Sequence, residues 1–385
     1  WRKILNLNYF ITNKRLIFKR KCLQKIIFNH SFIMMPRYDF NSLGGIEMNT
    51  DSLHRQLYAT DASVYRILPE GVCFPKNKLD IVSLVNFARE NKIPLIPRAG
   101  GTSLAGQVVG SGLIVDVSKY FNNILDFDAK AKTVTVEPGV VRHDLNAFLA
   151  PHQLFFGPNT STSNRCTIGG MVGNNSSGTT SIKYGVTRDK IQSVECVLHD
   201  GSVVLFEAKE MEECFKKGSK SDLEHQIYQF FTEILSDPDH QKSIRTEYPK
   251  ATVHRRNTGY ALDALLNDFT DHKVPMVNLA KLIAGSEGTL GFVTAITLSL
   301  DDVPPQESVM VAAHYDSIKK CLRSVAPLMK HPLYTCEMMD KTILDCTKNN
   351  INHAKNRFFL NGDPQGILML ELRAHTPSEL NKQLI

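Results

Sequence analysis

A glycine-rich segment that follows an apolar run constrains this chain more than any other part of its sequence. The apolar run from Ile93 to Ile96 ends at Pro97, and five small residues follow within ten positions: Gly100, Gly101, Thr102, Ser103 and Gly106. This order predicts a buried strand that leads into a small-residue loop. Because glycine has no Cβ, Gly100 and Gly101 can adopt positive φ and direct successive N–H groups at an anion such as a diphosphate.

The spacing within this loop argues against two common nucleotide-binding motifs. Gly101 to Gly106 has the Gly-x4-Gly spacing of a P-loop, but Gln107 and Val108 stand where Lys and Ser/Thr are needed. No Gly-x-Gly-x-x-Gly sequence opens a helix, so the Rossmann fingerprint is also missing. A nucleoside triphosphatase is not expected, and a dinucleotide would be held in another fold. For this loop alone, a tight turn without a ligand stays an alternative.

Further glycine clusters near strand ends favour a shared binding site over a single turn. Glu137-Pro138-Gly139 closes an expected strand at 133–136, and Tyr184-Gly185 follows the sequence Thr-Ile-Gly-Gly-Met-Val-Gly-Asn-Asn-Ser-Ser-Gly at 167–178. The sequence Gly-Ser-Glu-Gly-Thr-Leu-Gly at 285–291 precedes an expected strand at 292–300. These segments are poor in charge and rich in backbone donors. They suit a long, mostly neutral ligand with one diphosphate.

Taken in order, these segments resemble the FAD-binding domain of the vanillyl-alcohol oxidase superfamily, the PCMH-type fold. The resemblance runs from about Tyr65 to Leu300, and it is closest to the FAD-linked branch with glycolate oxidase, D-lactate dehydrogenase and D-2-hydroxyglutarate dehydrogenase. It implies an α+β protein, with a two-lobed PCMH-type FAD-binding domain followed by the start of a ferredoxin-like α+β cap domain. The segment 255–262 resembles one found in the large members that are fused to iron-sulfur motifs.

The resemblance also assigns roles to individual residues. Arg98 to Ser103 would wrap the FAD diphosphate, Pro138 and Gly139 would line the adenine side, and Ile168 to Gly170 would pass close to the flavin. Thr102 stands where relatives with covalent flavin have His, so non-covalent FAD is implied; Cys166 is interpreted as a packing residue. The expected FAD-binding set is Pro97, Arg98, Ala99, Gly100, Gly101, Thr102, Ser103, Gly106, Pro138, Gly139, Thr167, Ile168, Gly169, Gly170, Asn174, Ser177, Gly178, Tyr184, Gly185, Glu287 and Gly288.

The activity implied by the resemblance is oxidation of a D-2-hydroxy acid, with hydride transfer from the substrate Cα to flavin N5. Electrons would pass to an iron-sulfur centre, a quinone or a carrier protein, since no second dinucleotide motif indicates NAD. Arg255, Arg256 and Tyr260 are candidate ligands of the substrate carboxylate, with a solvated basic turn as the alternative. No catalytic base can be named. A non-catalytic FAD-binding subunit and a peptidoglycan-precursor reductase remain alternative functions.

Apolar periodicity and turn residues divide the 385-residue chain into expected elements and domains. Helices are predicted at 77–91, 221–236 and 317–329, β-hairpins at 123–137 and 191–206, and further strands at 113–117, 308–314 and 366–372. The expected domains are a basic leader at 1–35, an N-terminal segment at 36–64, the FAD-binding domain at 65–300 and an incomplete substrate or cap domain at 301–385. The FAD-binding domain would contain an insertion at about 210–275.

The positive charge of the chain is concentrated in its first residues. Residues 1–38 hold nine Lys or Arg and no acidic residue, so the other 347 residues carry 36 basic and 39 acidic groups, a net charge of −3. Nucleic acid and anionic membranes are therefore not expected partners of the folded part. The leader is either upstream sequence read in frame before Met34 or Met35, or a targeting segment.

Three further expectations concern the ends of the chain and its surroundings. Thr376-Pro377-Ser378-Glu379 is a strong helix-start signal six residues before the end, which indicates a truncated sequence. No local metal site is expected from the His and Cys spacing, and any iron-sulfur cluster would lie past Ile385. With no apolar run of about 20 residues and no paired Cys framework, the expected location is cytoplasmic, either free or peripheral to the membrane.

Overall fold

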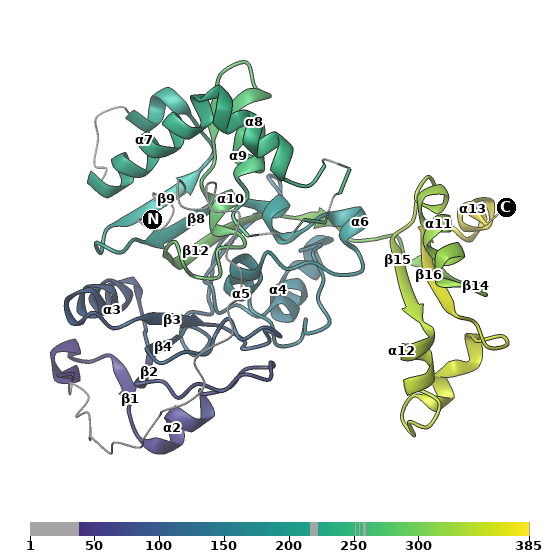
Figure 1. Ribbon diagram of the computed structural model, residues 1–385, viewed down its shortest axis with the longest axis horizontal. Helices are drawn as coiled ribbons and strands as arrows, with labels where there is room; N and C mark the ends of the chain where they lie inside the picture. Colours follow the sequence, from purple (N-terminus) through teal and green to yellow (C-terminus); the bar gives the residue numbers. More distant parts are fainter. Residues whose placement is uncertain (1–37, 216–221, 251, 254, 257–258, 385) are drawn as a thin grey trace, which may run out of the picture.

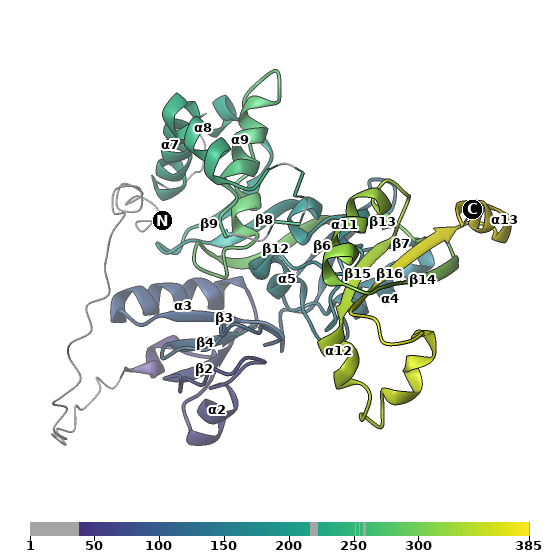
Figure 2. The same cartoon turned by 45° about the vertical axis from the view of Figure 1, so that its right-hand side comes forward.

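The computed structural model describes residues 38–215, 222–250, 252–253, 255–256 and 259–384. The expected leader at 1–35 lies outside these residues. Two lobes share most of the chain, and a smaller third part lies to one side of them (Figures 1 and 2). Helices and sheets are mixed throughout, as the α+β prediction requires.

The first lobe is built on a four-stranded sheet in the order β1-β2-β4-β3. The strands β2 (Gly71–Phe74), β4 (Leu113–Asp116) and β3 (Leu95–Arg98) are parallel, and β1 (Glu47–Asn49) pairs antiparallel with β2. The helix α3 (Lys78–Asn91) connects β2 to β3 and packs Ile81, Leu84 and Phe87 onto the sheet. The side chain of Asn77 caps this helix by accepting a hydrogen bond from the Asp80 N–H at 3.1 Å. Both β1 and α2 (Ser52–Leu57) lie in the expected N-terminal segment, yet β1 belongs to this sheet.

The second lobe is built on a five-stranded antiparallel sheet in the order β5-β6-β12-β8-β9. Its central strand, β12 (Phe292–Ser299), pairs with β6 (Thr133–Val136) on one side and β8 (Ile191–Val197) on the other. Every second residue of β12 is buried, the period expected of a strand with one covered face. The outer strands are β5 (Ile124–Asp128) and β9 (Val203–Glu207), so both predicted hairpins are confirmed.

The remaining elements of the second lobe surround this sheet. Short two-stranded ribbons join β7 (Leu154–Phe155) to β13 (Asp301–Asp302) and β10 (Lys209–Glu210) to β11 (Met276–Val277). The segment between β10 and β11, predicted to be an insertion, forms the helices α7 (Asp222–Ser236), α8 (Pro238–Glu247) and α9 (Leu262–Thr270) beside the lobe (Figure 1). The other elements of this lobe are α4 (Arg142–Leu149), α6 (Ser181–Tyr184), α10 (Ala280–Ile283) and the short 3₁₀ segments Ala150–His152, Thr187–Lys190 and Met211–Phe215. The 3₁₀ segment Phe40–Leu43 packs against α3 in the first lobe.

The third part is a three-stranded antiparallel sheet in the order β14-β16-β15, packed against helices. It contains β14 (Glu307–Tyr315), α11 (Ile318–Leu328), β15 (Thr335–Asp340), α12 (Lys341–Cys346), the 3₁₀ segment Ala354–Phe359, β16 (Gly366–Ala374) and α13 (Pro377–Gln383). The predicted helix start is confirmed, because the Thr376 and Glu379 side chains form a reciprocal capping box. Tyr334, just before β15, stacks edge-on against Tyr184 of α6 at a ring distance of 6.1 Å.

Two segments for which no helix was predicted from the sequence are helical. The glycine-rich run at 167–178 contains α5 (Ile168–Asn174), whose Ile168, Met171 and Val172 side chains are buried. The N–H group of Gly169 donates to the carbonyl oxygen of Pro138 at 2.8 Å, so tertiary contacts support this glycine-rich helix. The polar stretch after α7 contains α8, which starts at the Asp237 cap and Pro238, a signal the sequence carried.

Candidate functional site

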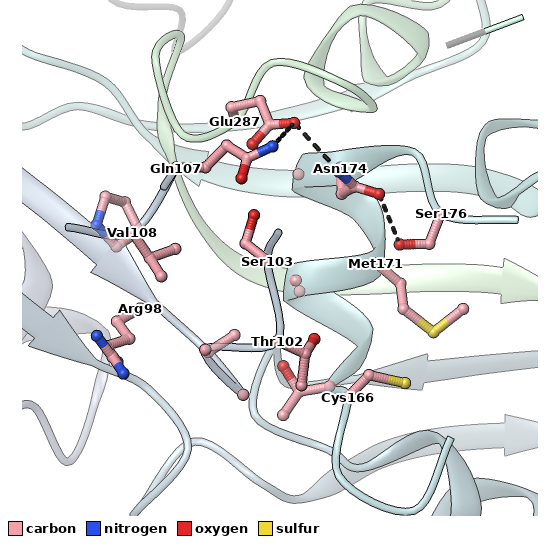
Figure 3. Close-up of a pocket in the computed structure, with 18 of the residues that line it drawn as sticks. Arg98, Thr102, Ser103, Gln107, Val108, Cys166, Met171, Asn174, Ser176 and Glu287 are labelled. Carbon is pink, nitrogen blue, oxygen red and sulfur yellow. Dashed lines mark hydrogen bonds between the residues drawn. The ribbon is translucent and has the colours of Figure 1, made fainter. Parts of the chain in front are cut away.

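A cavity of about 590 Å³ lies between the two lobes. The first lobe lines it with the loop that follows β3. The second lobe contributes the segment before α5, the α5 helix itself and the loop that precedes β12. Figure 3 shows side chains from these segments around the cavity, among them Thr102, Ser103, Met171 and Glu287.

A second cavity, of about 750 Å³, also borders the β3 loop, at Ala99 and Gly100. The two cavities share five lining residues: Arg98, Ala99, Gly100, Arg165 and Thr167. Tyr58, Asp116, Asn122 and Asp144 are among those that line only the second cavity. A ligand with two bulky halves joined by a narrow linker could therefore place one half in each cavity.

The structure brings most of the expected FAD-binding residues to these cavities. The first cavity is lined by Pro97 to Ser103, Pro138, Thr167, Gly169, Gly170, Asn174, Ser177, Glu287 and Gly288, and the second adds Gly139. Ile168 is fully buried in the core of the second lobe. Gly106, Gly178, Tyr184 and Gly185 line neither cavity. A binding role for any of these residues stays a prediction.

Two glycines in the β3 loop occupy positions where a side chain would collide. A Cβ on Gly100 would lie 2.5 Å from the carbonyl oxygen of Arg165, so the two lobes approach backbone to backbone here. Gly101 has φ +61°, and a Cβ there would lie 2.8 Å from Nη2 of Arg98. The expectation of positive φ is confirmed at Gly101. At Gly100, glycine is required because the backbone of the other lobe passes too close to leave room for a Cβ.

Two hydroxyl groups beside the first cavity are buried without a partner among the described residues. They are Oγ1 of Thr167, at the N-cap of α5, and Oγ of Ser177. A buried hydroxyl without a hydrogen bond costs about 1–3 kcal/mol, so such atoms indicate a missing partner. Together with the glycine loop, they fit a ligand that offers several polar atoms along its length, as a dinucleotide does.

A cluster of polar side chains surrounds the Glu287 carboxylate at another part of the first cavity (Figure 3). Oε1 of Glu287 accepts hydrogen bonds from the side-chain amides of Asn174 at 3.3 Å and Gln107 at 3.5 Å. Glu287 has a left-handed backbone with φ +54°, and its N–H group donates to the carbonyl oxygen of Gly173 at 2.9 Å. Burial raises the pKa of Glu287 above its ordinary value, and the two amide hydrogen bonds lower it in part. The side chain remains exposed toward the cavity.

The candidate carboxylate ligands lie apart from both cavities. Arg256 forms an ion pair with Asp263, and Arg255 is exposed. The hydroxyl of Tyr260 forms a hydrogen bond of 2.7 Å with Oγ1 of Thr289, two residues after Glu287. None of the three lines either cavity. Their role in binding a substrate carboxylate stays a prediction, and the neighbouring positions 257–258 lie outside the described residues.

Sequence reasoning missed several residues that line the cavities. The first cavity is lined by Thr160, Ser161 and Thr162 as well as by the β3 loop. The side-chain amide of Gln107 donates a hydrogen bond to Glu287. The cluster of small hydroxyl residues just before Thr167 was a usable signal. Tyr58 and Asp116, by contrast, lie in no glycine motif, and only the folded structure brings them to the second cavity.

Comparison with known proteins defines the class of this site. Residues 69–207 match the family model described as an FAD binding domain. The fold resembles that of alkyldihydroxyacetonephosphate synthase, with a TM-score of 0.56 over 88% of this chain and 55% of that chain, at 15% sequence identity. The five residues that the two cavities share thus lie within the matched FAD-binding region, in a PCMH-type fold.

Sequence relatives narrow the class further. The chain is 33% identical over 350 residues to D-2-hydroxyglutarate dehydrogenase of Pseudomonas putida, covering 88% of this chain and 33% of that protein. It is 27% identical over 294 residues to glycolate oxidase subunit GlcD of Bacillus subtilis, covering 75% of this chain and 50% of that protein. A mitochondrial D-lactate dehydrogenase of Saccharomyces cerevisiae is also 27% identical, over 72% of this chain and 37% of that protein.

These matches describe what the chain is similar to. It contains an FAD binding domain at residues 69–207, and over 72–88% of its length it is similar to the three relatives named above. It spans about a third of the length of the D-2-hydroxyglutarate dehydrogenases that it matches.

Among the described residues, no helix is both long and apolar enough to cross a membrane. The same part of the chain contains no group of three or more His, Cys, Asp or Glu that could hold a metal ion.

The variant Gly101→Val tests the role of the β3 loop. A β-branched residue at φ +61° is strained and would press against the Arg98 guanidinium, so we expect loss of stoichiometric FAD from the purified protein. The flavin absorbance per chain measures this loss. Gly362→Val is a matched control, because Gly362 also has positive φ, at +69°, but has open space around it and lies far from the cavities in sequence. A Gly101→Val protein that keeps its full flavin complement would contradict the assignment.

The variant Glu287→Gln tests the environment of the carboxylate. Since the pKa of Glu287 is raised in the folded protein, ionisation weakens the folded state as pH rises from the ordinary value of 4.5 through the raised value. Gln cannot ionise. We therefore expect the free energy of unfolding of Glu287→Gln, minus that of the wild-type protein, to increase over this pH window. Urea unfolding of the ligand-free proteins at several pH values measures the difference, and a flat or falling difference would refute this account.

Proposed function

We propose that this protein is an FAD-dependent oxidoreductase that oxidises a D-2-hydroxy acid of the lactate, glycolate or 2-hydroxyglutarate type. The observation that carries the proposal is the pair of cavities that meet at the Arg98 to Gly100 segment, within an FAD-binding domain. Relatives named D-2-hydroxyglutarate dehydrogenase, glycolate oxidase subunit and D-lactate dehydrogenase support the substrate class.

The residues of the two cavities fit the parts of FAD. The backbone donors of Gly100 to Ser103 and the Arg98 guanidinium would bind the diphosphate at the junction. Gly139 and the second cavity would take the adenosine half, and the first cavity, with α5 along one wall, would take the flavin half. Thr167 and Ser177 would supply hydrogen bonds that their buried hydroxyls lack in the described part of the structure.

When bound, FAD supplies the group that accepts a hydride from the substrate. The protein would orient the cofactor and limit the access of water to its reactive side. The Thr102 side chain lines the first cavity but offers no nitrogen for a covalent link to the flavin. Cys166 also lines this cavity, and because its thiol is buried it is interpreted as a packing residue, so the cofactor would be held without a covalent bond. An electron acceptor such as an iron-sulfur centre, a quinone or a carrier protein would then re-oxidise it.

An anaerobic visible spectrum of the purified protein tests this proposal. Titration with the D and L forms of lactate and 2-hydroxyglutarate, and with glycolate, should bleach the flavin band with one D-acid or with glycolate, while the L-acids leave it unchanged. Bleaching would also name the substrate. A flavin band that none of these acids bleaches would contradict the dehydrogenase proposal and favour a non-catalytic FAD-binding subunit or a reductase of the same fold.

A further inference from the structure

Arg98 lies at the junction of the two cavities, at the last position of β3. Its guanidinium is packed beneath the β3 loop, since a Cβ on Gly101 would lie 2.8 Å from its Nη2 atom. In the first cavity it is drawn apart from the Glu287 cluster (Figure 3). Arg98 and Glu287 therefore lie at different parts of the cavity.

The guanidinium has few partners of its own. Its one hydrogen bond runs from Nη1 to the carbonyl oxygen of Tyr58 at 3.4 Å, and it forms no ion pair within the described residues. A guanidinium carries five N–H donors and stays charged in proteins. Burial lowers the pKa of Arg98, while Asp116 and Tyr58 act in the opposite direction. A half-buried cation with unused donors beside two cavities indicates an anionic ligand group.

The position of this cation depends on Tyr58, which ends α2. Cζ of Arg98 lies 5.0 Å from the centroid of the Tyr58 ring, a cation–π contact. The ring is fixed in turn, because its hydroxyl donates to Oδ2 of Asp116 at 2.6 Å. Burial and the Asp116 carboxylate raise the pKa of Tyr58, so its hydroxyl keeps the proton that this hydrogen bond needs.

Both oxygens of the Asp116 carboxylate accept hydrogen bonds from residues other than Arg98. Its side chain is 6% exposed, and Oδ1 accepts hydrogen bonds from the backbone N–H of Ser118 at 2.7 Å and from its hydroxyl at 2.6 Å. With Oδ2 held by Tyr58, both oxygens already have donors. Asp116 thus supplies negative charge near Arg98 without taking up the N–H groups of the guanidinium.

We propose that Tyr58 and Asp116 are positioning residues that hold the Arg98 guanidinium in place for the diphosphate of the bound dinucleotide. This inference rests on the proposed FAD site. Tyr58 stacks on the guanidinium, and Asp116 fixes the Tyr58 ring and balances the charge of Arg98. Neither residue belongs to the glycine motifs, and Tyr58 precedes the matched FAD-binding region at 69–207.

The test measures the dissociation constant of FAD for the full chain after removal and return of the flavin. Tyr58→Phe keeps the ring and removes only the hydroxyl that fixes it to Asp116, so the guanidinium is held less firmly and we expect the constant to rise about tenfold, equivalent to about 1.4 kcal/mol. Tyr120→Phe is the matched control. It removes a hydrogen bond of 2.7 Å from a Tyr hydroxyl to the Glu47 carboxylate in the same lobe, outside both cavities. It should leave the constant within about twofold of the wild-type value.

A double-mutant cycle separates positioning from a general structural role. In an Arg98→Met background, which lacks the guanidinium, Tyr58→Phe should have no further effect on FAD binding. A Tyr58→Phe effect that persists in that background would overturn the inference, as would a Tyr58→Phe protein with wild-type affinity. Thermal denaturation of each variant is measured alongside. A Tyr58→Phe protein that is unfolded at the assay temperature would also overturn it, because the hydroxyl would then serve the fold.

Titration of the wild-type protein with FAD distinguishes failure of the positioning inference from failure of the proposed FAD site. A wild-type protein that does not bind FAD would reject the FAD site itself, and the inference with it. A wild-type protein that binds FAD, together with negative results for the variants, would leave the FAD site intact and reject only the roles of Tyr58 and Asp116.

Discussion

The site depends on a close approach between the backbones of the two lobes at Gly100. A Cβ at this position would lie 2.5 Å from the carbonyl oxygen of Arg165, a separation that real side chains do not tolerate. Because the β3 loop passes so close to the segment before α5, the two cavities share the residues on either side of this contact. The two lobes also contact each other where the loop before β12 packs Gly288 against Pro97. If the β3 loop or the loop before β12 moved outward, the residues that the two lobes contribute would no longer line the same cavities.

Local signals in the sequence were enough to predict much of the framework around this junction. Strand-like runs on either side of a short turn sequence predicted both hairpins of the second lobe, because the residues that pair are close together in the chain. Asn77 and the Thr376 capping box marked helix starts through hydrogen bonds that span only three residues. The β3 loop was found because glycine at a strand end has few explanations other than a turn or a ligand. The strand itself was expected to be buried, but all four of its residues are only partly buried.

Other features depend on contacts between distant segments, and no local pattern predicted them. The α5 helix contains Gly169, Gly170 and Gly173, which disfavour helices, yet it forms because it packs into the core and docks on Pro138. The helix ends at Asn175, a left-handed residue whose side chain accepts a hydrogen bond from the Arg188 N–H at 2.8 Å. Arg188 in turn donates to carbonyl oxygens of Lys281 and Ala284, near the loop before β12. Glycine motifs indicate where a cofactor is approached, but only the fold shows which side chains support it.

The central claim is that one FAD molecule occupies the joined cavities without a covalent bond. The most direct measurement is to denature the purified protein in acid, remove the precipitate, and identify and quantify the released flavin by chromatography. The account predicts one equivalent of FAD per chain in the soluble fraction. Absence of flavin, release of FMN in place of FAD, or flavin that remains attached to the precipitated protein would contradict it.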